Sequence, residues 1–318
     1  MKIDGKTLRR LIREAIRRNL TVLSEGGNVF SEVNSAVPKQ LLEKNIENAL
    51  KLAGLGDMEY EIVGNISRPL LGDIDIAVDE DQLREIINID KTADMKQVWT
   101  KLNEYIKSRH EINSGLGQFH LLAPLIGADD KQKNAVDPEG VDLGIPGVIQ
   151  IDVFVGNLGW MKNVLSGSPI DSKYKAVYRN ILLTSILSNV PHKLTDAEIA
   201  KYSELYPGKE IKKRFFVNFH KGNITRLYYE DNVGKSGKPL KSPTKVALEE
   251  ETMTNANDLA RTFMNEGYAK SLTWNDMNSY EKLIKLLNSD EFKFPELRQK
   301  IISDFKSSLG KNPVPTGL

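Results

Sequence analysis

Apolar positions along the first half of the chain recur with two periods, which together predict an alternation of helices and strands. After Pro38 they recur at helical spacing, and this predicts a helix that ends at Gly54 or Gly56. In residues 74–78, isoleucine and valine alternate with aspartate and alanine, which is the period of a strand with one buried face. The same criteria predict strands at residues 58–63, 118–126 and 147–156, and helices at residues 79–89, with Asp79 or Asp81 near the N-terminus, and 93–109.

The second half of the chain has a different pattern. Residues 173–190 have the pattern of a buried helix, and residues 213–231 that of a β-hairpin about Lys221-Gly222-Asn223. Residues 232–245 are rich in glycine, lysine, serine and proline, which predicts a loop, and helices are expected in residues 257–309. We therefore predict an α+β fold: a mixed sheet flanked by helices in residues 38–160, followed by a mainly helical C-terminal domain with a β-hairpin in residues 161–318.

Residues 1–24 combine a basic and an apolar face. Leucine and isoleucine recur at helical spacing, and Arg9, Arg10, Arg13, Arg17 and Arg18 lie between them, which predicts a basic amphipathic helix; residues 25–37 then have the composition of a linker. We expect the helix to dock on the rest of the chain or on a partner protein. The alternatives are binding to nucleic acid or an anionic surface, and a role as a sorting peptide. The segment resembles the short basic leader helices that begin many proteins of large tailed phages.

The composition is that of a globular protein and excludes several kinds of site. Of the 318 residues, 40% are hydrophobic and 27% charged, and the net charge of +1 means that any attraction to nucleic acid must be local. The absence of cysteine excludes disulfides and thiolate zinc sites, and the four histidines are too far apart in sequence for a His-rich metal motif. No apolar run has the length of a membrane span or signal core, so we expect a cytoplasmic protein without membrane contact, in the host cytoplasm or virion if a phage encodes it.

Three aspartates lie where packing alone does not explain them. Asp73 and Asp75 are one residue apart on the polar face of the predicted strand, where like charges repel unless water or a cation separates them. Asp152 lies in a strand that is apolar almost throughout, where an unpaired carboxylate is unfavourable. Gly64-Asn65, at the end of the preceding strand, forms a turn whose N–H groups suit an anion. Three carboxylates beside such a turn predict a magnesium site that also accepts phosphate groups.

These residues resemble the signature of the polymerase-beta-like nucleotidyltransferase superfamily. Val63-Gly64-Asn65 corresponds to its glycine turn, Asp73-Ile74-Asp75 to its acid pair on a strand, and Asp152 to the third acid on a later strand. Residues 63–78 look most like the corresponding stretch of tRNA CCA-adding enzymes and poly(A) polymerases. Asn65 stands in place of the usual Ser or Gly, and the spacer that normally precedes the acid pair is missing. The resemblance covers roughly residues 40–160.

The resemblance implies a nucleotidyltransferase palm that moves a nucleoside monophosphate from a nucleoside triphosphate to a hydroxyl by a two-metal mechanism. Asp73 and Asp75 would hold both Mg²⁺ (or Mn²⁺) ions, and Asp152 would hold the catalytic ion and help to deprotonate the acceptor. The residues implied in binding the nucleotide are Gly64, Asn65, Ser67, Arg68, Lys173 and Arg179. Gln118 and His120 fall on one face of a neighbouring strand, where they either border the pocket or serve the structure.

The acceptor stays open between a nucleic-acid 3′ end, a protein hydroxyl and a small molecule. The basic N-terminal helix, residues 235–245 and the cluster from Lys173 to Arg179 would form a positive track if they converge, which favours RNA or DNA ends. The competing functions are a non-catalytic, nucleotide-binding or virion-associated scaffold and glycosyl transfer from a nucleotide sugar.

Overall fold

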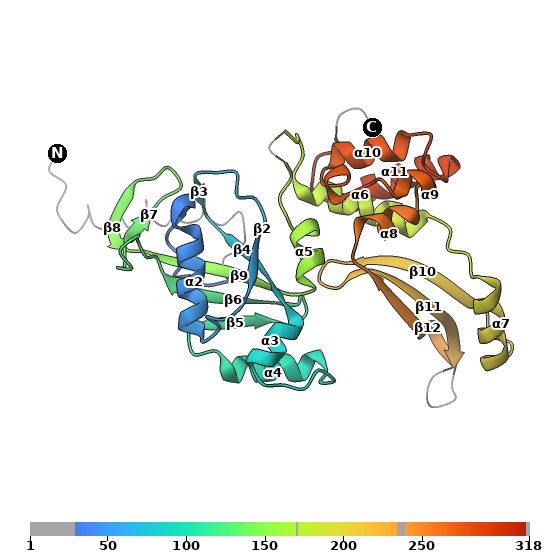
Figure 1. Ribbon diagram of the computed structural model, residues 1–318, viewed down its shortest axis with the longest axis horizontal. Coiled ribbons are helices and arrows are strands. Elements are labelled where there is room, and N and C mark those ends of the chain that lie inside the picture. Colours follow the sequence, from blue (N-terminus) through green and yellow to red (C-terminus); the bar gives the residue numbers. More distant parts are fainter. Residues whose placement is uncertain (1–28, 170, 234–238, 316–318) are drawn as a thin grey trace. The chain divides into compact units, whose positions relative to one another are not determined.

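Figure 1 shows the computed structural model of the protein, which describes residues 29–169, 171–233 and 239–315. The predicted basic helix, the start of the predicted linker and the basic stretch at residues 234–238 lie outside the described residues. The chain divides into two compact units, residues 1–158 and residues 159–318, two residues before the boundary expected from the sequence. No helix in the described part of the chain is long and apolar enough to cross a membrane.

The first unit is an α+β structure built on a mixed five-stranded sheet with the strand order β2-β4-β9-β6-β5. Its elements are β1 (Val37–Pro38), the 3₁₀ helix η2 (Lys39–Leu41), α2 (Leu42–Ala53), β2 (Tyr60–Val63), β3 (Leu70–Leu71), β4 (Ile74–Asp79), α3 (Glu80–Ile86), α4 (Met95–Tyr105), β5 (His110–Asn113), β6 (Gln118–Pro124), β7 (Asn134–Val136), β8 (Asp142–Pro146) and β9 (Val148–Gly156). Strands β4 and β9 are parallel, and the other neighbours in this sheet are antiparallel.

The elements predicted from strong periodicity are confirmed. Helix α2 ends at Gly54, which adopts a φ of 85°, and the side chain of Asp79 caps α3 by accepting the N–H groups of Asp81 and Gln82. The edge strand β5 and the small hairpin β7–β8 are additions that the sequence did not indicate. Both are short and largely exposed, so they lack the apolar alternation that identifies a strand.

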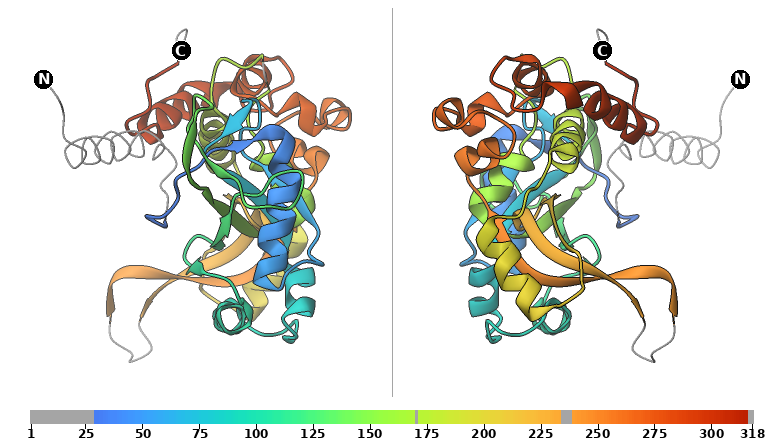
Figure 2. Two further views of the ribbon diagram at one scale, coloured as in Figure 1. Left: turned by 90° about the vertical axis from the view of Figure 1, so that its left-hand side faces the viewer. Right: turned by 90° about the vertical axis from the view of Figure 1, so that its right-hand side faces the viewer.

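The two faces of the five-stranded sheet differ in chemistry. Alternate residues of its central strands, such as Ile76, Ile151 and Phe119, are fully buried and pack with α2, α3 and α4 into one hydrophobic core. Figure 2 shows α2 lying along the sheet, in front of it in the left view. The intervening residues, among them Asp75 and Asp152, project from the opposite face, which we call the polar face.

Residues 29–36, which we call the strap, are bonded to the first unit although their composition is that of a linker. The backbone N–H groups of Val29 and Phe30 donate to the side-chain oxygen of Gln150. Asn34 exchanges hydrogen bonds with Val148 at the start of β9, and the phenyl ring of Phe30 is buried. The strap is thus fixed by side-chain amides and scattered backbone bonds, which leave no periodic pattern in a sequence.

The second unit combines helices with a three-stranded antiparallel sheet of order β10-β11-β12. Its elements are α5 (Leu158–Val164), α6 (Ala176–Asn189), α7 (Asp196–Leu205), β10 (Ile211–Asn218), β11 (Gly222–Val233), β12 (Pro239–Met253), α8 (Ala256–Arg261), α9 (Glu266–Ala269), η3 (Trp274–Asp276), α10 (Tyr280–Asn288), η4 (Pro295–Leu297) and α11 (Arg298–Ser308).

The predicted hairpin is present as β10 and β11, but the loop predicted at residues 232–245 is wrong at residues 232–233, which belong to β11, and again from Pro239 on. There the chain enters β12, which pairs with β11 over most of its length. Glycine, lysine and proline are the usual signals of a loop, whereas a strand can be stabilised by its neighbour irrespective of its own propensity. The described C-terminal unit is therefore less helical than we expected.

Candidate functional site

Hydrogen-bond register aligns the predicted acids across the polar face. Asp75 on β4 lies opposite Asp152 on the parallel strand β9, and Asp152 lies opposite His120 on β6. On the other side, Val63 of β2 lies opposite Asp75. Because residues opposite each other on paired strands project to the same face, the two carboxylates and the imidazole form one row across three neighbouring strands.

The turn after β2 brings backbone directly against the acid row. Gly64 adopts a φ of +74°, and a Cβ placed on it would meet the Asp75 Oδ2 atom at 2.5 Å. Only glycine fits such a close approach in this conformation. The next residue, Asn65, accepts hydrogen bonds from the N–H and the hydroxyl of Ser67, which holds the turn in shape. The glycine is therefore required by the geometry of the acid site.

A small pocket of about 80 Å³ lies beside this turn and contains several of the predicted residues. Asn65, Asp73 and Asp75 line it together with apolar residues of α2, β2 and β4. Asp73 lies in a bend just before β4 and is exposed, so it is not part of the strand as the alternation predicted. Arg68 is exposed and makes no ion pair with a described residue.

The electrostatics of the site are unbalanced in favour of negative charge. Burial, and then the charges of Asp152 and Asp73, raise the pKa of Asp75 to about 7, and His120 opposes this shift only in part. Among the described residues, none donates a hydrogen bond to the Asp75 carboxylate. A cation bound between the carboxylates would remove the repulsion.

Asp152, by contrast, is firmly hydrogen-bonded. The His120 ring nitrogen Nδ1 lies 2.8 Å from its Oδ1 atom, and the Gln150 amide nitrogen donates to the same oxygen at 2.7 Å. Sequence analysis placed His120 on one face of its strand together with Gln118 but could not assign its contact with Asp152, which depends on the pairing of β6 with β9. Gln150 is the member of this group that motif reasoning missed.

The donor set fits a hard divalent cation in part. Asp75 and Asp152 offer carboxylate oxygens from adjacent strands, and exposed Asp73 is close enough to influence Asp75, which is the ligand chemistry that Mg²⁺ and Mn²⁺ prefer. In the described ranges, no three acidic or histidine side chains already surround a common point in the manner of a metal centre.

Lys173 and Arg179 lie in the second unit, and the acids lie in the first. Arg179 is only 3% exposed, and its guanidinium donates to the backbone oxygens of Val164, Ser166 and Asn278. Those bonds occupy it inside its own unit, which argues against a role as a phosphate clamp. Lys173 is exposed, and its backbone N–H donates to Glu281.

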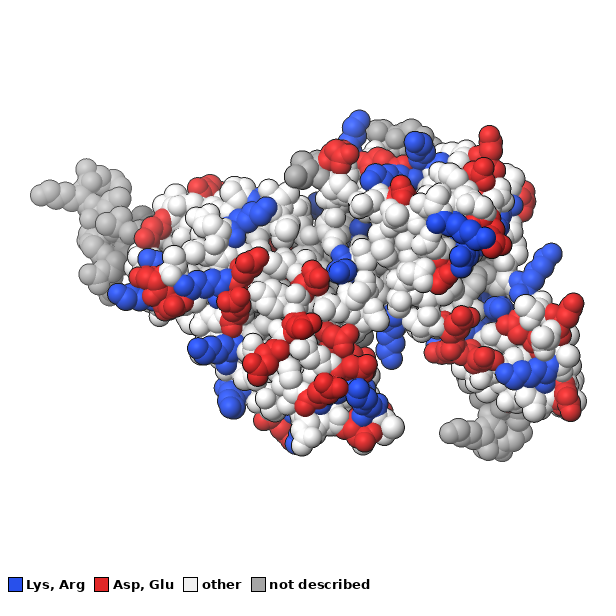
Figure 3. All heavy atoms as spheres, viewed as in Figure 1, with Lys and Arg blue, Asp and Glu red and all other residues white. Residues whose placement is uncertain are grey.

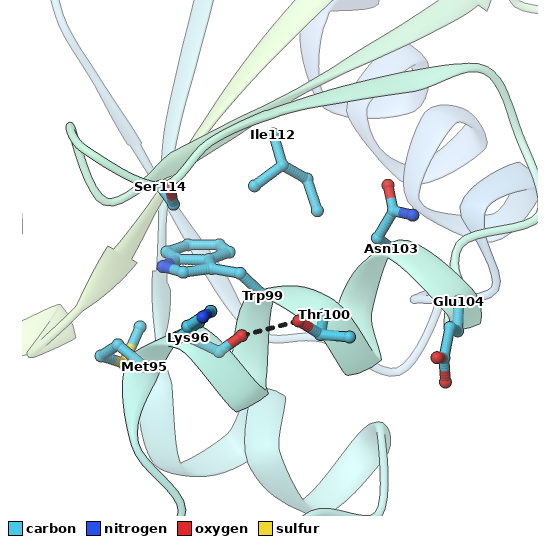
Figure 4. A pocket seen from close by; sticks show the side chains of 8 residues that line it. All are labelled: Met95, Lys96, Trp99, Thr100, Asn103, Glu104, Ile112 and Ser114. Atoms are coloured by element: carbon cyan, nitrogen blue, oxygen red, sulfur yellow. Dashed lines mark hydrogen bonds between the residues drawn. The ribbon is translucent and has the colours of Figure 1, made fainter.

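A larger pocket, of about 560 Å³, lies between α4 and β5 (Figure 4). Its lining residues are Met95, Lys96, Trp99, Thr100, Asn103, Glu104, Ile112 and Ser114. Ile112 pairs with the core residue Phe119, so this pocket opens on the side of the sheet that faces the helices. It contains none of the predicted site residues and only one acid, and its chemistry does not resemble that of the acid row.

The face of α3 and α4 seen in Figure 3 carries many acidic side chains with basic ones among them. These helices and the residues next to them contain the acids Glu80, Asp81, Glu85, Asp90, Asp94 and Glu104, and the exposed lysines Lys91, Lys96, Lys101 and Lys107.

A scan against protein-family models finds no match for this chain, and a search among curated proteins finds none either. The family resemblance therefore depends on the motif residues and their geometry alone.

Proposed function

We propose that the protein is a metal-dependent nucleotidyltransferase, which moves a nucleoside monophosphate from a nucleoside triphosphate to an acceptor hydroxyl and releases pyrophosphate. The observation that supports this most is the pair Asp75 and Asp152 on parallel neighbouring strands, with the backbone of Gly64 against it. Two adjacent carboxylates repel each other when no cation is present, which is unfavourable for the fold.

In this proposal each part of the site has one task. Asp75, Asp152 and Asp73 together would hold Mg²⁺ or Mn²⁺. When bound, the metal would activate the acceptor hydroxyl and stabilise the pyrophosphate. The turn at Gly64 and Asn65 offers backbone N–H groups to the phosphates. The acceptor oxygen bonds to the α-phosphorus, the bond from that phosphorus to the β-phosphate oxygen breaks, and Asp152 takes the hydroxyl proton.

The acceptor that we propose is the 3′ end of RNA or DNA. Its support is the clustering of basic residues in residues 1–24 and 234–245 of the sequence, since a polyanion needs such contacts. Extension of nucleic acid should weaken steeply as salt rises.

The test is release of pyrophosphate from each nucleoside triphosphate, with label followed into a mixture of RNA, DNA and protein. Asp75→Asn and Asp152→Asn should each reduce turnover by at least about a thousandfold. Asp79→Asn is the matched control, because it makes the same change on the same strand and asparagine also caps a helix. Wild-type turnover in Asp75→Asn would refute the assignment.

Label found only in protein would refute the nucleic-acid acceptor, and stabilisation by nucleotide sugars without pyrophosphate release would indicate glycosyl transfer instead.

A further inference from the structure

A chain of hydrogen bonds runs through the polar face from β6 to the strap. Gln118 Nε2 lies 3.4 Å from His120 Nε2, and His120 Nδ1 lies 2.8 Å from Asp152 Oδ1. On the other side of Asp152, Gln150 Nε2 donates to the same Oδ1 at 2.7 Å, and the N–H groups of Val29 and Phe30 donate to Gln150 Oε1 at 2.9 and 3.4 Å. The strap is thereby connected to the third acid of the site.

The direction of each bond in this chain is determined by chemistry. A backbone N–H can only donate, so the strap requires the oxygen of the Gln150 amide to face it and the nitrogen to face Asp152. At the other end, the Gln118 amide nitrogen donates to Nε2 of the imidazole, so the ring proton lies on Nδ1 and points to Asp152. Both donors are thus set before any ligand arrives.

Burial makes these contacts obligatory. His120 and Gln150 are each 3% exposed, so neither side chain can exchange its partner for water. Leaving a buried donor unpaired would be unfavourable, which keeps both donors on the Asp152 carboxylate. They converge on Oδ1, and no described residue donates to Oδ2.

We propose that Gln150 and His120 are positioning residues that hold the Asp152 carboxylate by Oδ1 and leave Oδ2 available to a divalent cation, and that the strap orients the Gln150 amide. This inference rests on the proposed metal-dependent function. It makes the N-terminal strap part of the site's support rather than a passive connection. Partners of this kind commonly change metal affinity by about 10- to 100-fold when they are removed.

The first test replaces Gln150 with methionine, which has a similar shape but neither donates nor accepts as an amide does. Binding of Mn²⁺ to the full-length protein is measured by the electron paramagnetic resonance of free Mn²⁺. We expect the Mn²⁺ dissociation constant of Gln150→Met to rise at least about tenfold. Gln82→Met is the matched control, because Gln82 also accepts a backbone N–H, from Glu59, and donates to a backbone oxygen, of Asp57, away from the acids.

The second test removes the strap's donor. Val29→Pro deletes the N–H that bonds to Gln150, whereas Val29→Ala keeps it, and the side chain itself is 39% exposed. We expect Val29→Pro to bind Mn²⁺ about threefold more weakly than Val29→Ala, because one hydrogen bond of modest strength is lost.

The third test separates positioning from packing at His120. In His120→Asn the amide nitrogen can take the place of Nδ1, whereas His120→Leu offers no donor. We expect His120→Asn to bind Mn²⁺ about tenfold more tightly than His120→Leu. If Gln150→Met does not fold, the Val29 and His120 pairs decide the matter.

The outcomes separate this inference from the proposed function. If the wild type binds Mn²⁺ and transfers nucleotides while all three comparisons show equal affinity, the positioning role is overturned and the function stands. If Mn²⁺ affinity depends on Gln150 and His120 but no nucleoside triphosphate yields pyrophosphate, the positioning role is supported and the function falls. A wild-type protein that binds no Mn²⁺ overturns both.

Discussion

Two charged residues in the first unit, the buried Arg84 on α3 and the half-buried Asp75 on β4, have opposite surroundings. Arg84 is 5% exposed and donates to the carboxylate of Glu80 at 3.0 and 2.7 Å. Its remaining donors reach the backbone oxygens of Asp90 and Ala93, so the guanidinium is paired on several sides. Asp75 has two further acids nearby and receives no hydrogen bond from any residue in the described ranges.

This difference separates a structural charge from a functional one. A buried ion pair with complete hydrogen bonding closes the connection between α3 and α4 and needs nothing from outside the chain. A carboxylate whose pKa is raised by its neighbours is destabilising unless a ligand compensates it, and such residues concentrate at functional sites. The comparison makes predictions about stability that do not depend on finding the substrate.

The largest change in stability is expected when the hydrogen bonds of Arg84 are removed. Arg84→Met should lower the free energy of unfolding by about 3 kcal/mol, because it leaves Glu80 without its partner and the backbone oxygen of Ala93 without this donor. Denaturant unfolding at pH 7 measures this. Lys91→Met removes an exposed ion pair with Glu85 and should change stability little. Equal losses in the two variants would show that the Arg84 network contributes no more than a surface pair.

Removing the negative charge of Asp75 should change the free energy of unfolding in the opposite direction. Asp75→Asn should stabilise the metal-free protein at pH 8, since the neutral amide avoids the repulsion from Asp152 and Asp73. The full shift of the Asp75 pKa corresponds to about 4 kcal/mol, and because the side chain is partly exposed we expect about 2 kcal/mol. Thermal unfolding in the presence of a chelator is the measurement. If Asp75→Asn is less stable than the wild type under these conditions, another group in the protein already compensates the charge of Asp75.

The raised pKa of Asp75 predicts that the stability of the metal-free protein depends on pH. The pKa of Asp75 is about 7 in the folded state and about 3.9 in the unfolded state, so the folded state keeps a proton that the unfolded state has lost. The metal-free wild type should therefore lose stability relative to Asp75→Asn between about pH 4 and pH 7, with no further change at higher pH. Mg²⁺ should reverse the order of the two proteins by stabilising the wild type alone. Parallel stability curves for the two proteins would contradict the assigned pKa shift.

A smaller effect is expected at the turn that touches the acid row. Gly64→Ala should destabilise the protein by about 1–2 kcal/mol, because its φ is +74° and a methyl group would press on the Asp75 carboxylate. Gly144→Ala is the matched control, since Gly144 has a φ of +67° but no atom within 4 Å of the added Cβ. Denaturant unfolding measures the loss of stability in each variant, and the loss in Gly64→Ala beyond that in Gly144→Ala is due to the contact with Asp75. Equal losses in the two variants would mean that backbone strain accounts for the whole effect.

The smallest effect is expected at Glu111, which is opposite His120 on the edge strand β5 and exposed. Glu111→Gln removes an acid from the same row without changing Asp75 or Asp152, so its thermal unfolding and Mn²⁺ affinity should both stay close to those of the wild type. A large change in either would extend the acid site to the edge of the sheet.

Much of the local structure follows from the sequence. The alternation in residues 74–78 identified β4 and its buried face. The sequence narrowed the end of α2 to Gly54 or Gly56 and the start of α3 to Asp79 or Asp81, and the structure has Gly54 and Asp79 there. Local patterns sufficed because each depends on neighbours in the chain. They failed for β12, which is bonded to the backbone of β11, and for the strap, which is bonded to the side chain of Gln150, because neither partner is a neighbour in the chain.

The sequence by itself determined that Asp75 and Asp152 lie on strands and face away from the apolar core, since strand alternation assigns faces without knowledge of the fold. Only the tertiary structure decided that these carboxylates are opposite each other and that His120 and Gln150 bond to one of them. It also decided that Arg179 is bonded within its own unit. The reason is that strand order and register arise from the packing of the whole sheet, and a shift of one residue would move every one of these side chains to the other face.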